Sequence, residues 1–181
     1  MIRVYVLVTC LFGLCSSYGQ SLKEPMTVNS LVKVQAGAQG IGLSFEPGIG
    51  SKLTIDLAAG VGGGYSIAEG TIDYDLLKPA LYFSATPRFF YNLSKRKAAG
   101  RNTGFNAGNY FGASVKYVVP FRRSDDKVRR AAMANIHWGI QRAIGGRFVF
   151  NSHVGVGYAN DIPTKFGTVY PAIDFRFSYV L

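Results

Sequence analysis

Residues 109–121 read Asn-Tyr-Phe-Gly-Ala-Ser-Val-Lys-Tyr-Val-Val-Pro-Phe, and this stretch decides the fold. Every second residue, beginning with Phe111, is apolar or aromatic, whereas the alternate positions include Gly112, Ser114 and Lys116. Alternation with a period of two predicts a β-strand that has one apolar face and one polar face. Because small residues accompany the charge, the polar face fits the inside of a narrow barrel, and the apolar face fits contact with lipid.

The same alternation recurs along the chain, in residues 52–61, 81–91, 134–141, 147–158 and 169–181. In each stretch the charged and amide groups keep to one face, which we predict to line the lumen of the barrel. Buried charges are tolerable when they are paired or hydrated, so we expect structural pairing there, with an ion pathway as the alternative. The expected polar network of the lumen consists of Asp56, Arg88, Lys116, His137, His153, Asp174 and Arg176.

The predicted fold is all-β, a transmembrane antiparallel up-and-down β-barrel with eight strands. A soluble sandwich would also alternate, but its charged face would meet water and need no small residues. Residues 33–45 form a seventh strand whose phase changes near Gly40, which we interpret as a β-bulge. Because bacterial single-chain barrels have even strand numbers, we place an eighth strand over Leu22–Leu31.

Connections of alternating length predict which end of the barrel faces outward, since periplasmic turns are short and outer loops are long. The expected outer loops, which would form the contact surface, are residues 62–78, 122–130 and 160–167. The expected periplasmic turns are residues 47–51, 92–107 and 145–146. Gly62-Gly63-Gly64 lacks the lysine and the following helix of a phosphate loop, so we interpret it as flexible loop backbone.

The start of the chain predicts export. Arg3 is followed by an apolar run over residues 4–14, which is too short for a transmembrane helix but typical of a secretory signal. Ser17 and Gly19 supply the small residues that a signal peptidase requires three and one positions before the cleaved bond. We therefore expect residues 1–19 to be a cleaved signal peptide and residues 20–181 to be one barrel domain in the cell outer membrane.

Composition narrows the chemistry. Both cysteines, Cys10 and Cys15, lie in the expected signal peptide, so a mature chain would have no disulfide and no cysteine metal site. The net charge of +10 is spread over several segments that also have a high aromatic content, which fits a membrane setting better than a solvated basic face. The basic clusters lack the aromatic interleaving and folded context that would favour a nucleic-acid partner. We expect no cofactor and no nucleic acid.

One expected outer loop is strongly basic. Guanidinium groups grip phosphate oxygens in pairs, so this loop is a candidate contact for lipopolysaccharide phosphates, and a plain solvated loop is the alternative. The candidate residues are Arg122, Arg123, Lys127, Arg129 and Arg130.

Several short motifs carry a resemblance to a known family. They are Pro-Arg-Phe-Phe-Tyr-Asn-Leu-Ser-Lys-Arg at 87–96, Gly-Arg at 100–101, Asn-Tyr-Phe at 109–111, Trp-Gly-Ile-Gln-Arg at 138–142 and Gly-Val-Gly-Tyr at 155–158. With them the chain resembles the small outer-membrane β-barrel proteins common in the Bacteroidetes. The resemblance implies an outer-membrane location and a barrel fold, and it leaves the activity unassigned. The partners that we expect are outer-membrane lipid and lipopolysaccharide, and the barrel-assembly machinery. A departure is the carboxyl end, Tyr179-Val180-Leu181, where such barrels often end on an aromatic residue.

Three functions remain open. The first is an integral barrel of structural or surface-interaction type, without catalysis. The second is a lipid-modifying enzyme similar to lipid A deacylases, which would use His137 or His153, although Ser152 has the outward parity and no acid is placed to orient either imidazole. The third is a narrow pore. The oligomeric state is left open.

Overall fold

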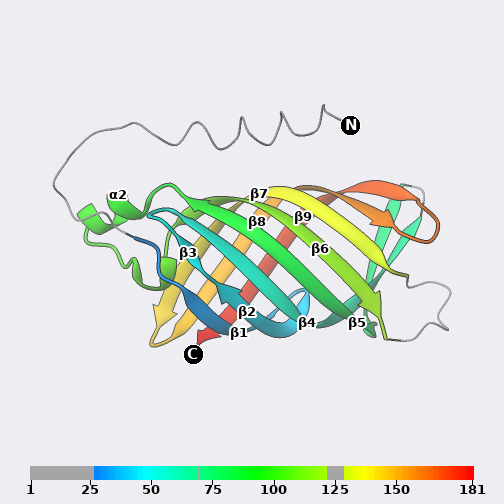
Figure 1. The fold of residues 1–181 in the computed structure, drawn as a ribbon, viewed down its shortest axis with the longest axis horizontal. Helices are drawn as coiled ribbons and strands as arrows, with labels where there is room; N and C mark the ends of the chain where they lie inside the picture. Colours follow the sequence, from blue (N-terminus) through cyan, green and yellow to red (C-terminus); the bar gives the residue numbers. More distant parts are fainter. Residues whose placement is uncertain (1–26, 69, 122–128) are drawn as a thin grey trace, which may run out of the picture.

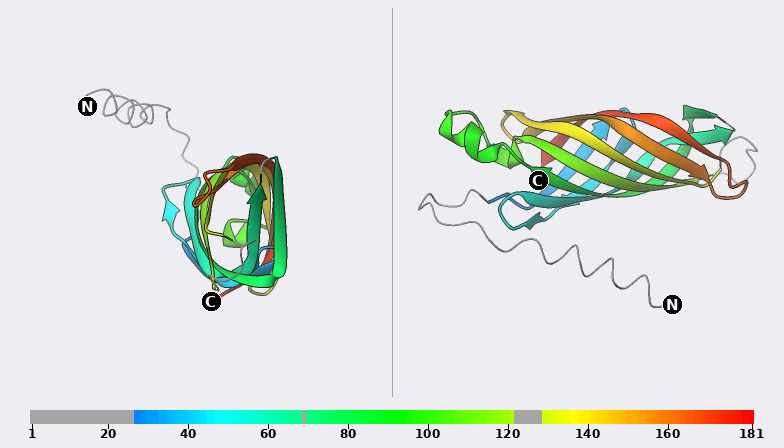
Figure 2. Two further views of the ribbon diagram at one scale, coloured as in Figure 1. Left: turned by 90° about the vertical axis from the view of Figure 1, so that its right-hand side faces the viewer. Right: turned by 90° about the horizontal axis from the view of Figure 1, so that it is seen from above.

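The computed structural model describes residues 27–68, 70–121 and 129–181, and it is a closed antiparallel barrel. The ring contains β1 (Leu31–Gly37), β2 (Gly40–Glu46), β4 (Leu53–Ala68), β5 (Thr71–Phe90), β6 (Asn109–Pro120), β7 (Ala131–Gly145), β8 (Phe148–Asp161) and β9 (Gly167–Val180). Each strand pairs with its neighbour along the chain, and β1 pairs with β9 to close the ring (Figure 1, Figure 2). The predicted eight-stranded, all-β, up-and-down barrel is confirmed.

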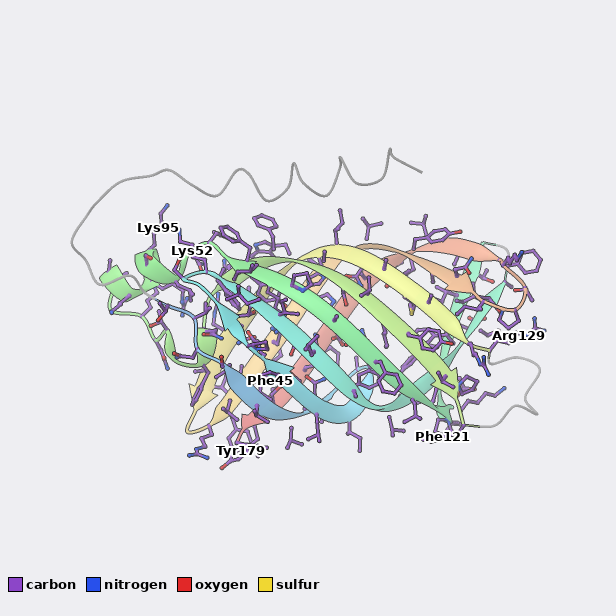
Figure 3. The ribbon with its side chains drawn as sticks, viewed as in Figure 1. Phe45, Lys52, Lys95, Phe121, Arg129 and Tyr179 are labelled. Carbon is purple, nitrogen blue, oxygen red and sulfur yellow. The ribbon has the colours of Figure 1, made fainter. Side chains whose placement is uncertain are left out.

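The barrel is polar inside and apolar outside. Along β1 and β9, buried and exposed residues alternate, as the period of two requires. Large apolar side chains on the outer face are exposed, including those of Leu43, Phe83, Val115, Ile136 and Ile173. Figure 3 shows side chains projecting from the wall along its length, with Lys52 and Lys95 at one end and Arg129 at the other. An apolar belt between charged ends is the surface of a transmembrane barrel.

The eighth strand does not lie where it was expected. Residues 33–45 are not one bulged strand but the hairpin of β1 and β2, joined by a two-residue turn at Ala38 and Gln39. Residues 27–30, the described part of the region before β1, contain no strand. The phase change marks a reversal of the chain, completed by Gly40 with a φ of 114°, a conformation that glycine adopts readily.

The stretch 62–78 was expected to be a long loop, but residues 62–68 belong to β4 and residues 71–78 belong to β5. Nor is the glycine run flexible loop backbone, because it lies in β4 against the β1–β2 turn. A Cβ on Gly62 would lie 2.0 Å from the main-chain oxygen of Gln39. Glycine is therefore needed at this position for two chain segments to approach closely.

The two ends of the barrel differ. The connection from β5 to β6 contains a short helix, α2 (Leu93–Ala98), and a 3-10 turn, η1 (Gly104–Asn106), at the end where the carboxyl terminus lies (Figure 1). We call this the α2 end. The two-residue strand β3 (Gly48–Ile49) pairs with the start of β4 at the same end.

The opposite end carries the β4–β5 connection and the turn after β8. The signal peptide expected at residues 1–19 lies outside the described residues and stays a prediction. In the part of the chain that the structure describes, no helix is long and apolar enough to cross a membrane.

Candidate functional site

The half of the lumen nearer the α2 end is filled by a network of ion pairs. Lys33 Nζ lies 2.5 Å from Glu46 Oε2 and 3.5 Å from Asp56 Oδ1. Arg88 pairs with Asp56 and lies 3.5 Å from Glu46 Oε2. Arg176 lies 3.6 Å from Asp56, so this carboxylate meets three cations. Lys33, Glu46, Asp56 and Arg88 are buried and Arg176 is partly buried, which is tolerable because opposite charges are paired.

A layer of amides and one tyrosine continues this network toward the α2 end. Arg88 Nη1 donates to Gln141 Oε1 at 3.4 Å, and Asn151 Nδ2 donates to the same oxygen at 3.1 Å. The Tyr110 hydroxyl donates to Asn151 Oδ1 at 3.0 Å. Gln141 in turn donates to the main-chain oxygen of Phe105 at 2.8 Å, which ties the wall to η1.

The α2 end of the barrel is closed by the connection from β5 to β6. Asn106 is buried and exchanges two hydrogen bonds with the main chain of Asn29, at 2.7 and 2.9 Å. Next to it, Val28, Phe90, Leu93 and Tyr110 form an apolar cluster. In the part of the chain that the structure describes, these side chains occupy the α2 end of the lumen.

The other end is covered by the β4–β5 tip, which we define as residues 64–68 and 71–75. Gly63 pairs with Pro79 but Gly64 pairs with Asp75, so residues 76–78 of β5 form a bulge at which the hairpin bends. Tyr65 and Ile67 of the tip belong to one buried cluster with residues of β6, β7 and β8, namely Val118, Ala131, Met133 and Ala159. The tip thus lies across the barrel, at the right-hand end of Figure 1.

A cavity of about 260 Å³ remains between the tip and the ion-pair network. Aromatic side chains of the tip and of the wall line it, together with polar side chains of the lumen. The principal lining residues are Tyr65, Tyr74, Tyr82, Lys116, Tyr170 and Asp174. Larger hollows, one of them of about 910 Å³, are lined by outward residues such as Leu43 and Phe83, so we attribute them to the outer surface of the barrel.

Lys116 lies in this cavity, apart from the ion-pair network. Its Nζ donates to Gln39 Oε1 at 2.6 Å and to the Tyr65 hydroxyl at 3.1 Å. The same nitrogen lies 5.0 Å from the ring centre of Tyr65 and 5.1 Å from that of Tyr82, close enough for cation–π attraction. This lysine connects the wall to both the tip and the β1–β2 turn.

The two histidines of the expected network stack on each other. The rings of His137 and His153 are 4.0 Å apart, and His137 Nδ1 lies 2.6 Å from Asn135 Oδ1. Ser152, the serine considered for a hydrolase pair, donates instead to the main-chain oxygen of Asp174 at 3.0 Å. Among the described residues, no group of three or more metal-ligating side chains is present.

The structure places the expected lumen residues in three groups. Asp56, Arg88, Asp174 and Arg176 share the ion-pair network, with Arg176 Nε 2.9 Å from Asp174 Oδ2. Lys116 lies in the cavity, and the histidines form a stacked pair.

Lys33 and Glu46 were not predicted as lumen residues, because residues 33–45 were interpreted as one bulged strand and Glu46 directly follows that stretch. With two strands of opposite phase, the same alternation rule would have placed both side chains inside.

The basic loop is described only in part. Arg122, Arg123 and Lys127 lie outside the described residues. Arg129 is partly buried and Arg130 is exposed, and the main-chain oxygen of Arg130 accepts a bond from the Ile162 N–H at 3.0 Å. Their expected role toward lipopolysaccharide stays a prediction.

By its strand order the chain falls in the class of eight-stranded, up-and-down β-barrels. No protein-family model matches it, and no curated protein matches it. Among solved structures it is similar to the outer membrane protein AlkL, determined by solid-state NMR in DMPC lipid bilayers. The two chains are 12% identical, the match covers 92% of this chain and 96% of AlkL, and the TM-score is 0.38. At that score the likeness carries no argument, so the barrel assignment rests on the strand pairing alone.

Proposed function

We propose that this chain is an integral barrel of a bacterial outer membrane, of structural or surface-interaction type, which performs no catalysis and conducts nothing along its axis. The observation that carries the proposal is the inverted polarity of the barrel. Paired charges such as Arg88 and Asp56 are buried in the lumen, while Val115, Ile136 and Ile173 are exposed on the outside. In water such a surface would aggregate, whereas in a bilayer it meets apolar chains.

The filled lumen favours a closed barrel over the narrow pore. Ion pairs occupy one half of the lumen, and the β4–β5 tip lies across the other end. An eight-stranded barrel is only wide enough for its own side chains to fill it. We therefore expect no steady current through planar bilayers that contain the purified protein, and stepwise conductance would contradict this part of the proposal.

A non-enzymatic role is also favoured over hydrolysis of lipid. A serine nucleophile needs a base within hydrogen-bond reach, and Ser152 bonds a main-chain oxygen instead. Lipid A from cells with His137→Ala and His153→Ala should match the wild-type profile. A change in the acylation of lipid A would instead support the hypothesis of a lipid-modifying enzyme.

Membrane insertion is tested by gel mobility and fractionation. The protein should be recovered with the outer membrane and should run at different positions in boiled and unboiled samples, because a closed barrel resists detergent until heated. A soluble periplasmic protein without such a shift would overturn the proposal.

We place the source of the protein among the Bacteroidetes, because of the short motifs quoted in the sequence analysis.

We expect outer-membrane lipid and lipopolysaccharide to bind the outer surface of the barrel. The end opposite α2 contains Arg129 and Arg130, which would lie near lipid phosphates if that end faces outward. Changing both to glutamine should weaken binding to lipopolysaccharide but leave the gel mobility shift intact. The barrel-assembly machinery is the expected partner during insertion.

A further inference from the structure

The wall of the barrel is incomplete on one side. Residues 176–180 of β9 pair with β1, whereas residues 167–174 pair with β8 alone. On the other flank, β4 pairs with β2 only as far as Val61. The last main-chain bond between β9 and this hairpin runs from the Ala38 N–H to the Phe175 oxygen, at 3.1 Å. Beyond the β1–β2 turn, no ladder joins β9 to β4 among the described strands, so the wall has an opening there, and the β4–β5 tip returns to β9 through the apolar cluster against which Tyr170 packs.

This opening leads into the cavity that contains Lys116. The residues along its edge also line the cavity, and they are Ala38, Gln39, Gly40, Pro171, Ala172 and Ile173. Outside the opening lie two aliphatic side chains, Ile41 and Ile173, which are 64% and 65% exposed. Because these side chains belong to the apolar belt, the cavity opens sideways toward lipid.

The lumen carries one more positive charge than negative charge among the described residues of its network and cavity. The cations are Lys33, Arg88, Lys116 and Arg176, and the carboxylates are Glu46, Asp56 and Asp174. Lys33, Arg88 and Arg176 each lie within 4.0 Å of a carboxylate. In the described part of the chain, the salt bridges include none to Lys116.

Lys116 has room for an anion. An ammonium carries three donors, and the two side chains that accept hydrogen bonds from Lys116, those of Gln39 and Tyr65, are both neutral. A cation taken out of water is stabilised most by an opposite charge at hydrogen-bond distance. An anionic group in the cavity would therefore complete the donors of Lys116 and neutralise the lumen.

We propose that the cavity binds the anionic head of a single-chain amphiphile, such as a fatty-acid carboxylate, whose chain passes through the side opening into the surrounding lipid. This inference rests on the proposed membrane location. The cavity volume of about 260 Å³ is well above the roughly 10–15 Å³ that one water molecule needs. The head and the first methylenes would fill it, and the rest of the chain would lie along Ile41 and Ile173.

The experiment uses the full-length protein folded in a non-ionic detergent and dodecanoate labelled with 13C at its carboxyl carbon. Saturable binding should shift the carboxyl resonance. Lys116→Met keeps the length of the stem and removes the charge, and it should weaken binding about tenfold or more, the loss expected for one charge-assisted hydrogen bond. Lys52→Met is the matched control, since Lys52 is an exposed lysine at the α2 end (Figure 3), and it should bind as the wild type does.

Two further probes separate the chemistry. Dodecyltrimethylammonium has the same chain with the opposite charge, and acetate has the head without the chain. Both should bind at least tenfold more weakly than dodecanoate. A second variant, Ala38→Trp, narrows the opening without touching Lys116 and should also weaken dodecanoate binding.

Several results would overturn the proposal: no saturable binding of dodecanoate, equal binding to Lys116→Met, equal binding of the cationic probe, or equal binding of acetate. Every variant is first checked for the heat-dependent gel shift, and Lys116→Gln replaces the methionine variant if that one does not fold. Because the gel shift and the membrane fractionation are read independently, a failure of ligand binding is distinguishable from a failure of the proposed membrane location.

Discussion

Replacing Arg88 by methionine tests whether paired charges hold the barrel together. Arg88 is 1% exposed and contacts two carboxylates, those of Asp56 and Glu46. Methionine keeps much of the side-chain volume but leaves these carboxylates with one cation fewer. Removing one partner of a buried ion pair typically costs about 3–5 kcal/mol. Because Lys33 still contacts both carboxylates, we expect a loss near the lower end, about 3 kcal/mol.

The assay is urea unfolding of the barrel in lipid vesicles, followed by the fluorescence of Trp138, the chain's single tryptophan. Arg147→Met is the matched control, because Arg147 is exposed in the turn between β7 and β8. It should change the free energy of unfolding by less than about 0.5 kcal/mol, as surface substitutions usually do.

A double variant with Asp56→Asn isolates the pair. Once the carboxylate of Asp56 has been neutralised, loss of Arg88 should cost less than it does in the wild type, by about 0.5–3 kcal/mol. Two results would contradict a stabilising role of the ion pairs. One is that Arg88→Met lowers the free energy of unfolding no more than Arg147→Met does. The other is that the effects of Arg88→Met and Asp56→Asn are additive in the double variant.

Two other consequences concern the wall and its lipid face. Gly155→Ala should lower the free energy of unfolding by about 1–3 kcal/mol, because its Cβ would lie 2.0 Å from the main-chain oxygen of Ile136; an unchanged urea midpoint would contradict that close approach. Trp138 is 39% exposed on the outer face and donates to the Tyr91 hydroxyl at 2.8 Å, so brominated lipids in vesicles should quench its emission. Emission unaffected by the bromines would place this face away from lipid.

The sequence predicted the barrel because successive side chains of a β-strand point to opposite faces, so a wall with one polar face and one apolar face leaves a period of two in the sequence. It misplaced one strand because the turn at Ala38 and Gln39 contains none of the residue pairs that mark tight hairpins, such as Asn-Gly. The only signs of the chain reversal in the sequence were the phase change and Gly40. A β-bulge within one strand would give the same two signs. In this respect the local pattern was ambiguous, and pairing with β9 and β4 resolved it.

The site was predicted in part. Alternation assigned Asp56, Arg88, Asp174 and Arg176 to the polar face, but it does not specify which charges meet across the lumen. That depends on the shear of the barrel and on strands far apart in sequence, as with Lys33 and Asp56. The cavity was not predicted at all, since it arises where the β4–β5 tip bends into the lumen.

The pairing of the first strand with the last also governs how the barrel forms. Lys33 of β1 lies opposite Val180 of β9, so the ring cannot close until nearly the whole chain is available. Contacts so distant along the chain carry a large loop-closure entropy and slow folding. This seam is also short, from Lys33 to Gly37, whereas β8 and β9 pair from Phe148 to Asn160. Pairing of β1 with β9 is therefore the folding step that closes the barrel. The same pairing is where we expect the closed barrel to open first.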